Sequence, residues 1–393
     1  TVYEKGAEVI RMLQTLLGRD AFRRGFDRYI ANNDGHAVTC EHFIDAILEG
    51  SNIDKELFKR WYSQAGTPRV TVTTTYDASA HTLTLTCAQS TPPTPDQPSK
   101  EPCLIPFPVA LFDRQGNALP LKLQDEPLVS GKTEQMLQLT AAVQSWIFCD
   151  VPSEPVISLN RGFAAPVIVE YDYSDDDLAL LAKHDTNAFN RWEALQQLMM
   201  RELLTQVQAV LSQEEQTVSP VLFEAFEALI TDESLSPAYK AVAMELPSER
   251  LIGDALPVID PWAVHYAREF VRERLGTRTL TKLEEIVAAC KLQGEYSPDP
   301  VDAGKRAFKN MALYYLIATA NKHAILLVRD QYIVANNLTD KLAALTLMSG
   351  SSSPVKQEMN VETLNEWISE PLLLNKWFTI QATAPCLNGE VPV

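Results

Sequence analysis

Tyr3, in the string Tyr3-Glu4-Lys5-Gly6, is the residue of this chain whose type and position most suggest chemistry. A tyrosine hydroxyl with a pKa of about 10 is protonated at pH 7 and can donate a hydrogen bond to a developing oxyanion. Apolar residues recur at helical spacing over residues 9–17, so Tyr3 is expected at the positive, N-terminal end of a helix. On spacing alone, a tyrosine at such a position is more often a packing or surface residue.

Metal ligands are scarce in this sequence. The motif His-Glu-x-x-His is absent, and no two of the six histidines stand four residues apart. His36, Cys40 and His42 are close together, but their spacing is not that of a zinc finger or of a helical histidine pair. His42 stands three residues after Thr39, a predicted helix cap, where a polar residue is ordinary. The capping interpretation is therefore favoured over a metal site.

Other motifs with a defined chemistry are also missing. The acidic run at 175–177 lacks the glycine and distal glutamate of a calcium-binding loop, so we interpret it as a helix start. Neither Gly-x-Gly-x-x-Gly, Walker A nor Gly-x-Ser-x-Gly occurs. The sequence therefore gives no support for nucleotide binding or for a serine hydrolase.

Hydrophobic periodicity divides the chain into three parts, so the predicted class is multidomain α+β. Residues 1–66 have helical spacing, with Thr39 and Asp54 as predicted caps. Residues 67–172 alternate with period two and predict a small β-sandwich. Beyond strands near residues 70–74 and 83–87, strands are expected at 105–112, 119–123, 135–139, 145–149 and 166–171.

Residues 173–393 return to helical spacing and predict an α-helical array, an irregular α-solenoid without a legible repeat. The last helix is expected at 360–370, with no capping helix after it, which would make this domain incomplete. Expected helices are 175–184, 186–212, 219–231, 236–245, 249–254, 260–275, 278–293, 299–319, 321–336, 338–348 and 360–370.

Six collinear blocks resemble the aminopeptidase N family of gluzincin zinc metallopeptidases, and most of all the C-terminal portion of its bacterial branch. One short string would be weak evidence, but the blocks run in order over nearly the whole chain. They are residues 1–12, 61–68, 91–97, 173–175, 189–194 and 376–383.

The resemblance implies a fold and an activity. Residues 1–66 would be the helical end of a thermolysin-like catalytic domain, followed by the sandwich and the helical array. Family members use zinc to remove N-terminal residues from peptides, as in peptide catabolism. Tyr3 matches the tyrosine whose hydroxyl stabilises the tetrahedral intermediate, and Glu4 matches an acidic neighbour that lies near the substrate or serves a structural role.

The resemblance also implies what this chain lacks. The zinc ligands and the general base of the family precede its tyrosine, so zinc belongs to the full-length parent and none is held by this chain. We therefore expect the isolated chain to be inactive. We also expect the first helix to expose Ile10, Leu13 and Leu17. The alternative hypothesis is a non-enzymatic scaffold, in which the sandwich and helices bind peptides or protein partners.

Composition narrows the class of partner. The 34 basic and 51 acidic residues give a net charge of −17, which argues against nucleic acid. No apolar run is long enough to span a membrane. Six scattered cysteines are typical of a reduced, cytoplasmic protein. We therefore expect peptide substrates, no nucleic acid, no membrane contact, a cytoplasmic location and a monomer.

Overall fold

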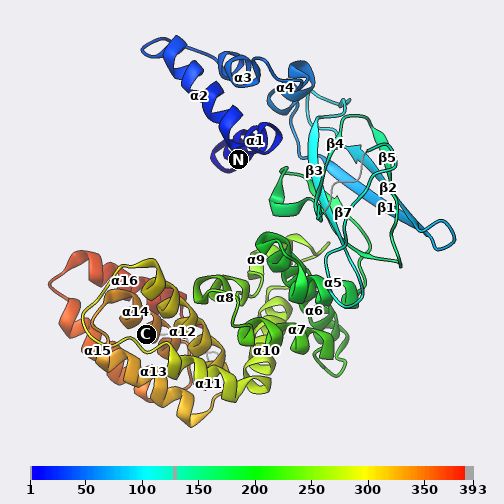
Figure 1. The fold of residues 1–393 in the computed structure, drawn as a ribbon. Coiled ribbons are helices and arrows are strands. Elements are labelled where there is room, and N and C mark those ends of the chain that lie inside the picture. The colour runs from blue at the N-terminus through cyan, green and yellow to red at the C-terminus, as the bar shows by residue number, and fades with distance from the viewer. Residues whose placement is uncertain (1, 127–130, 386–393) are drawn as a thin grey trace. The chain divides into compact units, whose positions relative to one another are not determined.

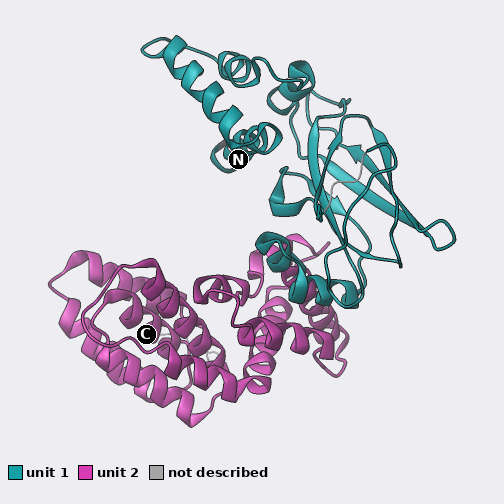
Figure 2. Ribbon diagram, in the orientation of Figure 1, with its two compact units in different colours: residues 1–194 teal, residues 195–393 magenta. Residues whose placement is uncertain are grey.

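The computed structural model describes residues 2–126 and 131–385. The chain forms two compact units, residues 1–194 and 195–393 (Figure 2). The order of elements along the chain is helices, then strands, then helices (Figure 1). Each unit is described by itself below.

The first unit begins with four helices, and their ends follow from local sequence. Gly18, at φ 76°, separates the first helix from the second, because this left-handed conformation suits glycine. The Thr39 amide donates to His42 Nδ1 at 3.2 Å, and the Leu57 amide donates to Asp54 Oδ1 at 3.0 Å. Both predicted caps are thus confirmed. The helices are α1 (Val2–Leu17), α2 (Arg19–Asn33), α3 (Cys40–Leu48) and α4 (Lys55–Ser63).

The first helix buries more of its apolar face than expected. Leu13 is fully buried and Leu17 is half-buried, whereas Ile10 is 40% exposed. The expectation that all three are exposed is therefore wrong for Leu13. Leu13 lies on the same side of the helix as Val9 and Met12, which are also buried, so this side faces the core of the first unit.

Two sheets follow and confirm the predicted β-sandwich. The four-stranded sheet has the order β5-β2-β1-β7, and the three-stranded sheet has the order β4-β3-β6. Strands β1 and β2 pair antiparallel from Arg69 with Ser90 to Asp77 with Thr82, while β7 runs parallel to β1. The strands are β1 (Arg69–Asp77), β2 (Thr82–Ser90), β3 (Ile105–Phe112), β4 (Gln135–Leu139), β5 (Val143–Phe148), β6 (Val156–Ser158) and β7 (Ile168–Glu170).

One predicted strand is wrong and another was missed. Residues 119–123 form no strand, although isolated bridges at Ala118 and Leu123 and a few backbone hydrogen bonds join this segment to its neighbours. Pro120 stands in the middle of the segment and has no backbone N–H to donate to a ladder. The missed strand, β6, is only three residues long, too short for a period-two pattern to be visible.

Helix α5 (Asp175–His184) follows the sandwich in the chain, and the boundary between the first and second units falls within α6 (Ala188–Ser212). The Asp177 amide donates to the Ser174 hydroxyl at 3.1 Å, so the acidic run begins a helix, as predicted. Gly116 packs directly on the His184 side chain, where an added Cβ would lie 2.3 Å from the ring. The 113–117 turn is therefore held against α5.

The second unit is an array of helices, as expected. Helix α12 lies at its centre and contacts α8, α10, α11, α13 and α14. The helices are α7 (Pro220–Thr231), α8 (Pro237–Ala243), α9 (Glu249–Asp254), α10 (Pro261–Arg278), α11 (Leu280–Ala289), α12 (Pro300–Ala318), α13 (Lys322–Val334), α14 (Leu338–Ser349), α15 (Val355–Trp367) and α16 (Pro371–Thr383).

The end of the array differs from the prediction. A further helix, α16, occupies residues 371–383, so the expectation of no helix after residue 370 is wrong. Pro371 is the first residue of α16, where its missing N–H costs nothing and its fixed φ suits a helix. A proline is therefore a start signal here, although within a helix it would be a breaker.

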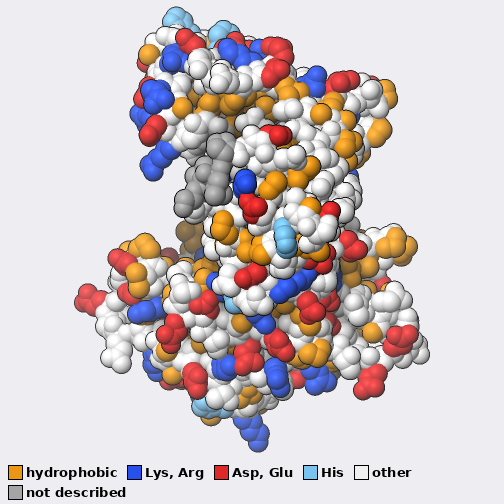
Figure 3. Space-filling view, turned by 45° about the vertical axis from the view of Figure 1, so that its right-hand side comes forward, with side chains coloured by type: hydrophobic (Ala, Val, Ile, Leu, Met, Phe, Trp, Pro, Cys, Tyr) orange, Lys and Arg blue, Asp and Glu red, His pale blue; other side chains and the backbone are white. Residues whose placement is uncertain are grey.

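The helices, the surface charges and the cysteines bear on membrane contact and on redox state. No helix among the described residues is both long enough and apolar enough to cross a bilayer. Acidic and basic side chains are interspersed over the face in view, with hydrophobic side chains between them (Figure 3). Cys40, Cys87, Cys103, Cys149 and Cys290 are free thiols, and Cys386 lies outside the described residues.

Candidate functional site

Tyr3 and Glu4 lie in the first turn of α1, and both side chains are exposed. Tyr3 is 87% exposed, so its side chain is accessible from solvent. A hydrogen bond from its own backbone amide lowers the pKa of Glu4 and keeps it a carboxylate. A phenol and a carboxylate thus stand side by side at the start of one helix.

Lys5 fastens this end of α1 to the beginning of the sandwich. Its ammonium donates to the carbonyl oxygen of Gly66 at 2.5 Å and approaches the Thr67 hydroxyl at 3.5 Å. Burial lowers the pKa of Lys5, with the Cys103 thiol opposing that shift. The residue after the Tyr3-Glu4 pair is therefore a structural contact that fixes where the pair stands.

Arg11 fastens the same helix two turns further on. Its guanidinium donates to the carbonyl oxygens of Gly162, at 2.9 Å, and of Phe163. The Nε atom of Arg11 donates to Glu8 at 2.6 Å, and the guanidinium lies 6.0 Å from the Phe163 ring centre. Together, Lys5 and Arg11 hold α1 at two points along its length.

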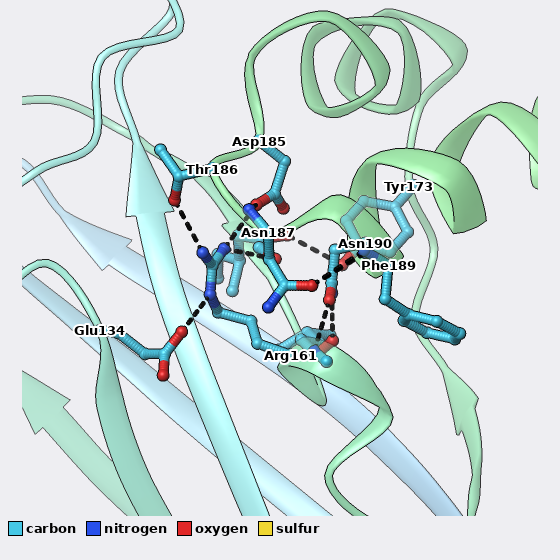
Figure 4. Close-up of polar contacts among 12 residues, drawn as sticks. Glu134, Arg161, Tyr173, Asp185, Thr186, Asn187, Phe189 and Asn190 are labelled. Atoms are coloured by element: carbon cyan, nitrogen blue, oxygen red, sulfur yellow. Dashed lines mark hydrogen bonds and ion pairs between the residues drawn. The ribbon is translucent and has the colours of Figure 1, made fainter. Parts of the chain in front are cut away.

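The turn that receives Arg11 is held by a buried polar network (Figure 4). The Arg161 side chain is 4% exposed and pairs with Asp185, which is fully buried, at 2.7 Å. Its Nε atom pairs with Glu134 at 2.7 Å, and it also donates to Thr186 at 2.8 Å. Asn190 accepts the Gly162 amide at 2.9 Å. The network fixes the Gly162 carbonyl that α1 uses.

The remaining predicted chemistry is not assembled into a site. His42 serves as a cap of α3, and no group of three or more metal-ligating side chains gathers anywhere in residues 2–126 and 131–385. His36, Cys40 and His42 are exposed, and His42 occupies the capping position that the sequence favoured for it.

Sequence reasoning missed the roles of Arg11, Arg161 and Asp185, although Arg11 itself belongs to block 1–12. Asn190 belongs to block 189–194, and Gln97 belongs to block 91–97. Gln97 donates to the Ser63 carbonyl at 2.9 Å and accepts the Ala65 amide at 2.8 Å. The blocks thus contain residues that join one element to the next, and their side-chain amides were the available signal.

The comparisons with known proteins follow the order of these elements. A profile described as the Peptidase family M1 domain matches residues 1–61. A domain of unknown function with an Ig-like fold, DUF3458, matches residues 66–172, and its companion with ARM repeats, DUF3458_C, matches residues 175–389. Aminopeptidase N of Escherichia coli is 39% identical over 390 residues, which is 99% of this chain. This chain belongs to the aminopeptidase N family.

Further relatives are similar to this chain over nearly its whole length. The Haemophilus influenzae protein is 35% identical over 98% of this chain, and the Caulobacter vibrioides protein is 36% identical over 98%. The crystal structure of Legionella pneumophila aminopeptidase A in complex with aspartic acid matches with a TM-score of 0.82 at 25% identity, over 98% of this chain and 44% of that one. The chain spans 44% of the Escherichia coli protein's length.

Proposed function

We propose that this chain forms part of a zinc aminopeptidase that removes N-terminal residues from peptides. In this proposal Tyr3 donates a hydrogen bond to the oxyanion of the tetrahedral intermediate. Glu4 stands beside the bound substrate and adds negative charge close to its amino group. The substrates are peptides, and the working protein is a cytoplasmic monomer.

The observation that carries the proposal is the position of Tyr3. The residue lies within the matched peptidase domain, in the first turn of a helix whose amide dipoles point toward it. Its hydroxyl is exposed, while Lys5 and Arg11 bind the helix to fixed carbonyl groups. A donor held in this way reaches an oxyanion without reorganisation, which is the condition for electrostatic stabilisation.

Zinc does not fit the residues present in this chain. The sequence has no His-Glu-x-x-His motif, and the described residues contain no cluster that could hold the ion. No catalytic step at a metal is therefore assigned to these residues. The proposal gives this chain the oxyanion donor and the two domains that follow it.

The first experiment uses residues 1–393 alone. We expect no hydrolysis of leucine p-nitroanilide, with or without added zinc. No group of described residues can hold the ion, and the sequence lacks the His-Glu-x-x-His motif that supplies the family's general base. Chelator-sensitive turnover by this polypeptide would show that it holds a complete site, contrary to the proposal.

The second experiment tests Tyr3 in a working enzyme. This chain would replace the matching part of Escherichia coli aminopeptidase N, and Tyr3→Phe would be made in the chimera. Removal of one oxyanion donor lowers kcat about 10²–10³-fold. We expect KM to change little, since the donor acts mainly in the transition state.

Tyr62→Phe is the matched control, because Tyr62 is 42% exposed on α4 and loses the same hydroxyl. It should leave kcat within about twofold of the unmodified chimera. Equal losses in both variants would refute the assignment of Tyr3. An inactive but folded parent chimera would argue instead for the scaffold hypothesis.

A further inference from the structure

A cavity of about 450 Å³ lies within the second unit and is lined by residues from α11, α12, α13, the start of α14 and the segments between them. This volume is in the range of small-molecule sites. Asn336 donates to the Gly294 carbonyl at 2.9 Å and so joins the segments after α13 and α11 across its edge. Val287, Leu292, Leu327 and Val334 supply apolar wall.

Charged side chains line the cavity, and most of them already have partners. Lys309 pairs with Asp340 at 3.0 Å, and both side chains are no more than 10% exposed. On the rim, Lys291 pairs with Asp330 at 2.9 Å. Each of these two ion pairs is neutral overall, so neither provides a net charge that would attract a ligand.

Arg306 is the exception among the cations. It is 4% exposed, and within the described part of the chain no carboxylate pairs with it. Its guanidinium donates to the Ser297 carbonyl at 2.7 Å and lies 4.8 Å from the centre of the Tyr296 ring. A buried guanidinium whose donors are only partly used favours an anion, and a planar carboxylate matches its fork.

Two further residues of the lining favour a ligand that carries a positive charge and N–H donors. Glu284 has only a 3.9 Å contact with His323 and is 28% exposed. Gln331 is 6% exposed, and its Oε1 atom has no hydrogen-bond partner among the described atoms. An unsatisfied buried acceptor is costly, and a ligand that carries N–H groups would relieve that cost.

We propose that this cavity binds a zwitterionic α-amino acid with an apolar side chain. The carboxylate pairs with Arg306, the ammonium group lies toward Glu284, and the side chain contacts the apolar wall. A multiply charged anion such as phosphate is disfavoured, because acidic residues share the lining. The inference is independent of the peptidase proposal, since binding is measured on this chain alone.

Isothermal titration on residues 1–393 tests the site with four probes: L-leucine, 4-methylpentanoate, 3-methylbutylamine and inorganic phosphate. L-Leucine is expected to bind saturably. The two analogues lack the ammonium and the carboxylate, respectively, and each should bind at least about tenfold more weakly, as expected for one lost charge-assisted hydrogen bond. Phosphate should neither bind more tightly nor displace L-leucine.

Two variants separate the two ends of the ligand. Arg306→Gln should weaken L-leucine at least about tenfold and leave 3-methylbutylamine unchanged. Glu284→Gln should weaken L-leucine similarly and leave 4-methylpentanoate unchanged. Arg329→Gln is the matched control, since Arg329 pairs with Glu358 and does not line the cavity. It should leave all affinities unchanged.

Tyr296→Leu is a second variant, for use if Arg306→Gln does not fold. Tyr296 is 50% exposed, so its ring can be removed without loss of a buried side chain, and the Arg306 guanidinium that stacks on it would no longer be held in place. It too should weaken L-leucine. No heat of binding with L-leucine at about 50 mM would overturn the proposal. So would phosphate displacing L-leucine, 4-methylpentanoate binding as tightly as L-leucine, or equal affinities in the Arg306 and Arg329 variants.

Discussion

Replacing Asp185 with alanine tests whether the buried network around Arg161 holds the junction between the sandwich and α6. The Asp185 side chain is fully buried and that of Arg161 is 4% exposed, so loss of the carboxylate leaves a guanidinium with little access to water. Removing one partner of a buried ion pair costs about 3–5 kcal/mol. Glu134 keeps its contact with Arg161, so we expect the lower end, about 3 kcal/mol.

Glu134→Ala is the matched control for this prediction. It removes a carboxylate from the same guanidinium at the same 2.7 Å distance, but the Glu134 side chain is 50% exposed. Pairs of this kind contribute about 0–1 kcal/mol. The difference between the two variants, about 2 kcal/mol or more, therefore isolates the effect of burial.

Hydrogen exchange with peptide-level mass spectrometry is the assay, because the chain forms two units and a single unfolding curve would mix them. Peptides from residues 156–190 should lose protection in Asp185→Ala, while peptides from residues 300–318 provide the reference. Arg161→Met combined with Asp185→Leu should recover much of the loss, since no charge stays buried. Equal costs for Asp185→Ala and Glu134→Ala, or a double variant worse than the single one, would refute the reasoning.

Two further predictions concern a glycine and a thiol. Gly276→Ala should destabilise the second unit by several kcal/mol in the same hydrogen-exchange assay, because the new Cβ would lie 2.5 Å from the Tyr315 carbonyl oxygen. Gly6→Ala, with nothing within 4 Å of the new Cβ, should be neutral or should stabilise the first unit by up to about 1 kcal/mol. Burial raises the pKa of Cys87 from 9.0 to about 12, so the folded chain keeps a proton that the unfolded chain loses between these values. The stability contributed by this thiol is therefore full below about pH 9 and falls as the pH rises toward 12. At pH 10.5 the free energy of unfolding of the wild type should have fallen by about 2 kcal/mol more than that of Cys87→Val. Parallel pH profiles of unfolding free energy for the two proteins would contradict this.

Much of the fold could be predicted from local patterns. The strands at 105–112 and 135–139 and the helix at 249–254 have the expected bounds. The first of these strands is a continuous apolar run that is buried along its whole length, and such a run between turn residues predicts a buried strand. Prediction failed where a short signal competed with the pattern. Pro120 prevents the strand expected at 119–123, and Pro371 begins a helix that was not expected.

The candidate site was predictable only in part. Tyr3 came from a family resemblance, since a tyrosine at a helix start has no distinctive spacing. The residues that hold its helix could not be found in the same way, because Arg11 contacts carbonyl groups 151 and 152 residues away in the chain. Such contacts depend on the tertiary fold and leave no local pattern.

The shortest polar contacts of the helix that carries Tyr3 with the rest of the unit end on backbone oxygens. The carbonyl groups of Gly66, Gly162 and Phe163 accept these hydrogen bonds, and the three residues have left-handed φ angles of 97°, 63° and 53°. Side chains at these sites could therefore change chemically without releasing the helix, provided that the backbone keeps its shape. A substitution that returned Phe163 to an ordinary right-handed or extended conformation would turn the carbonyl away and let the phenol drift, even though no polar side chain had been lost.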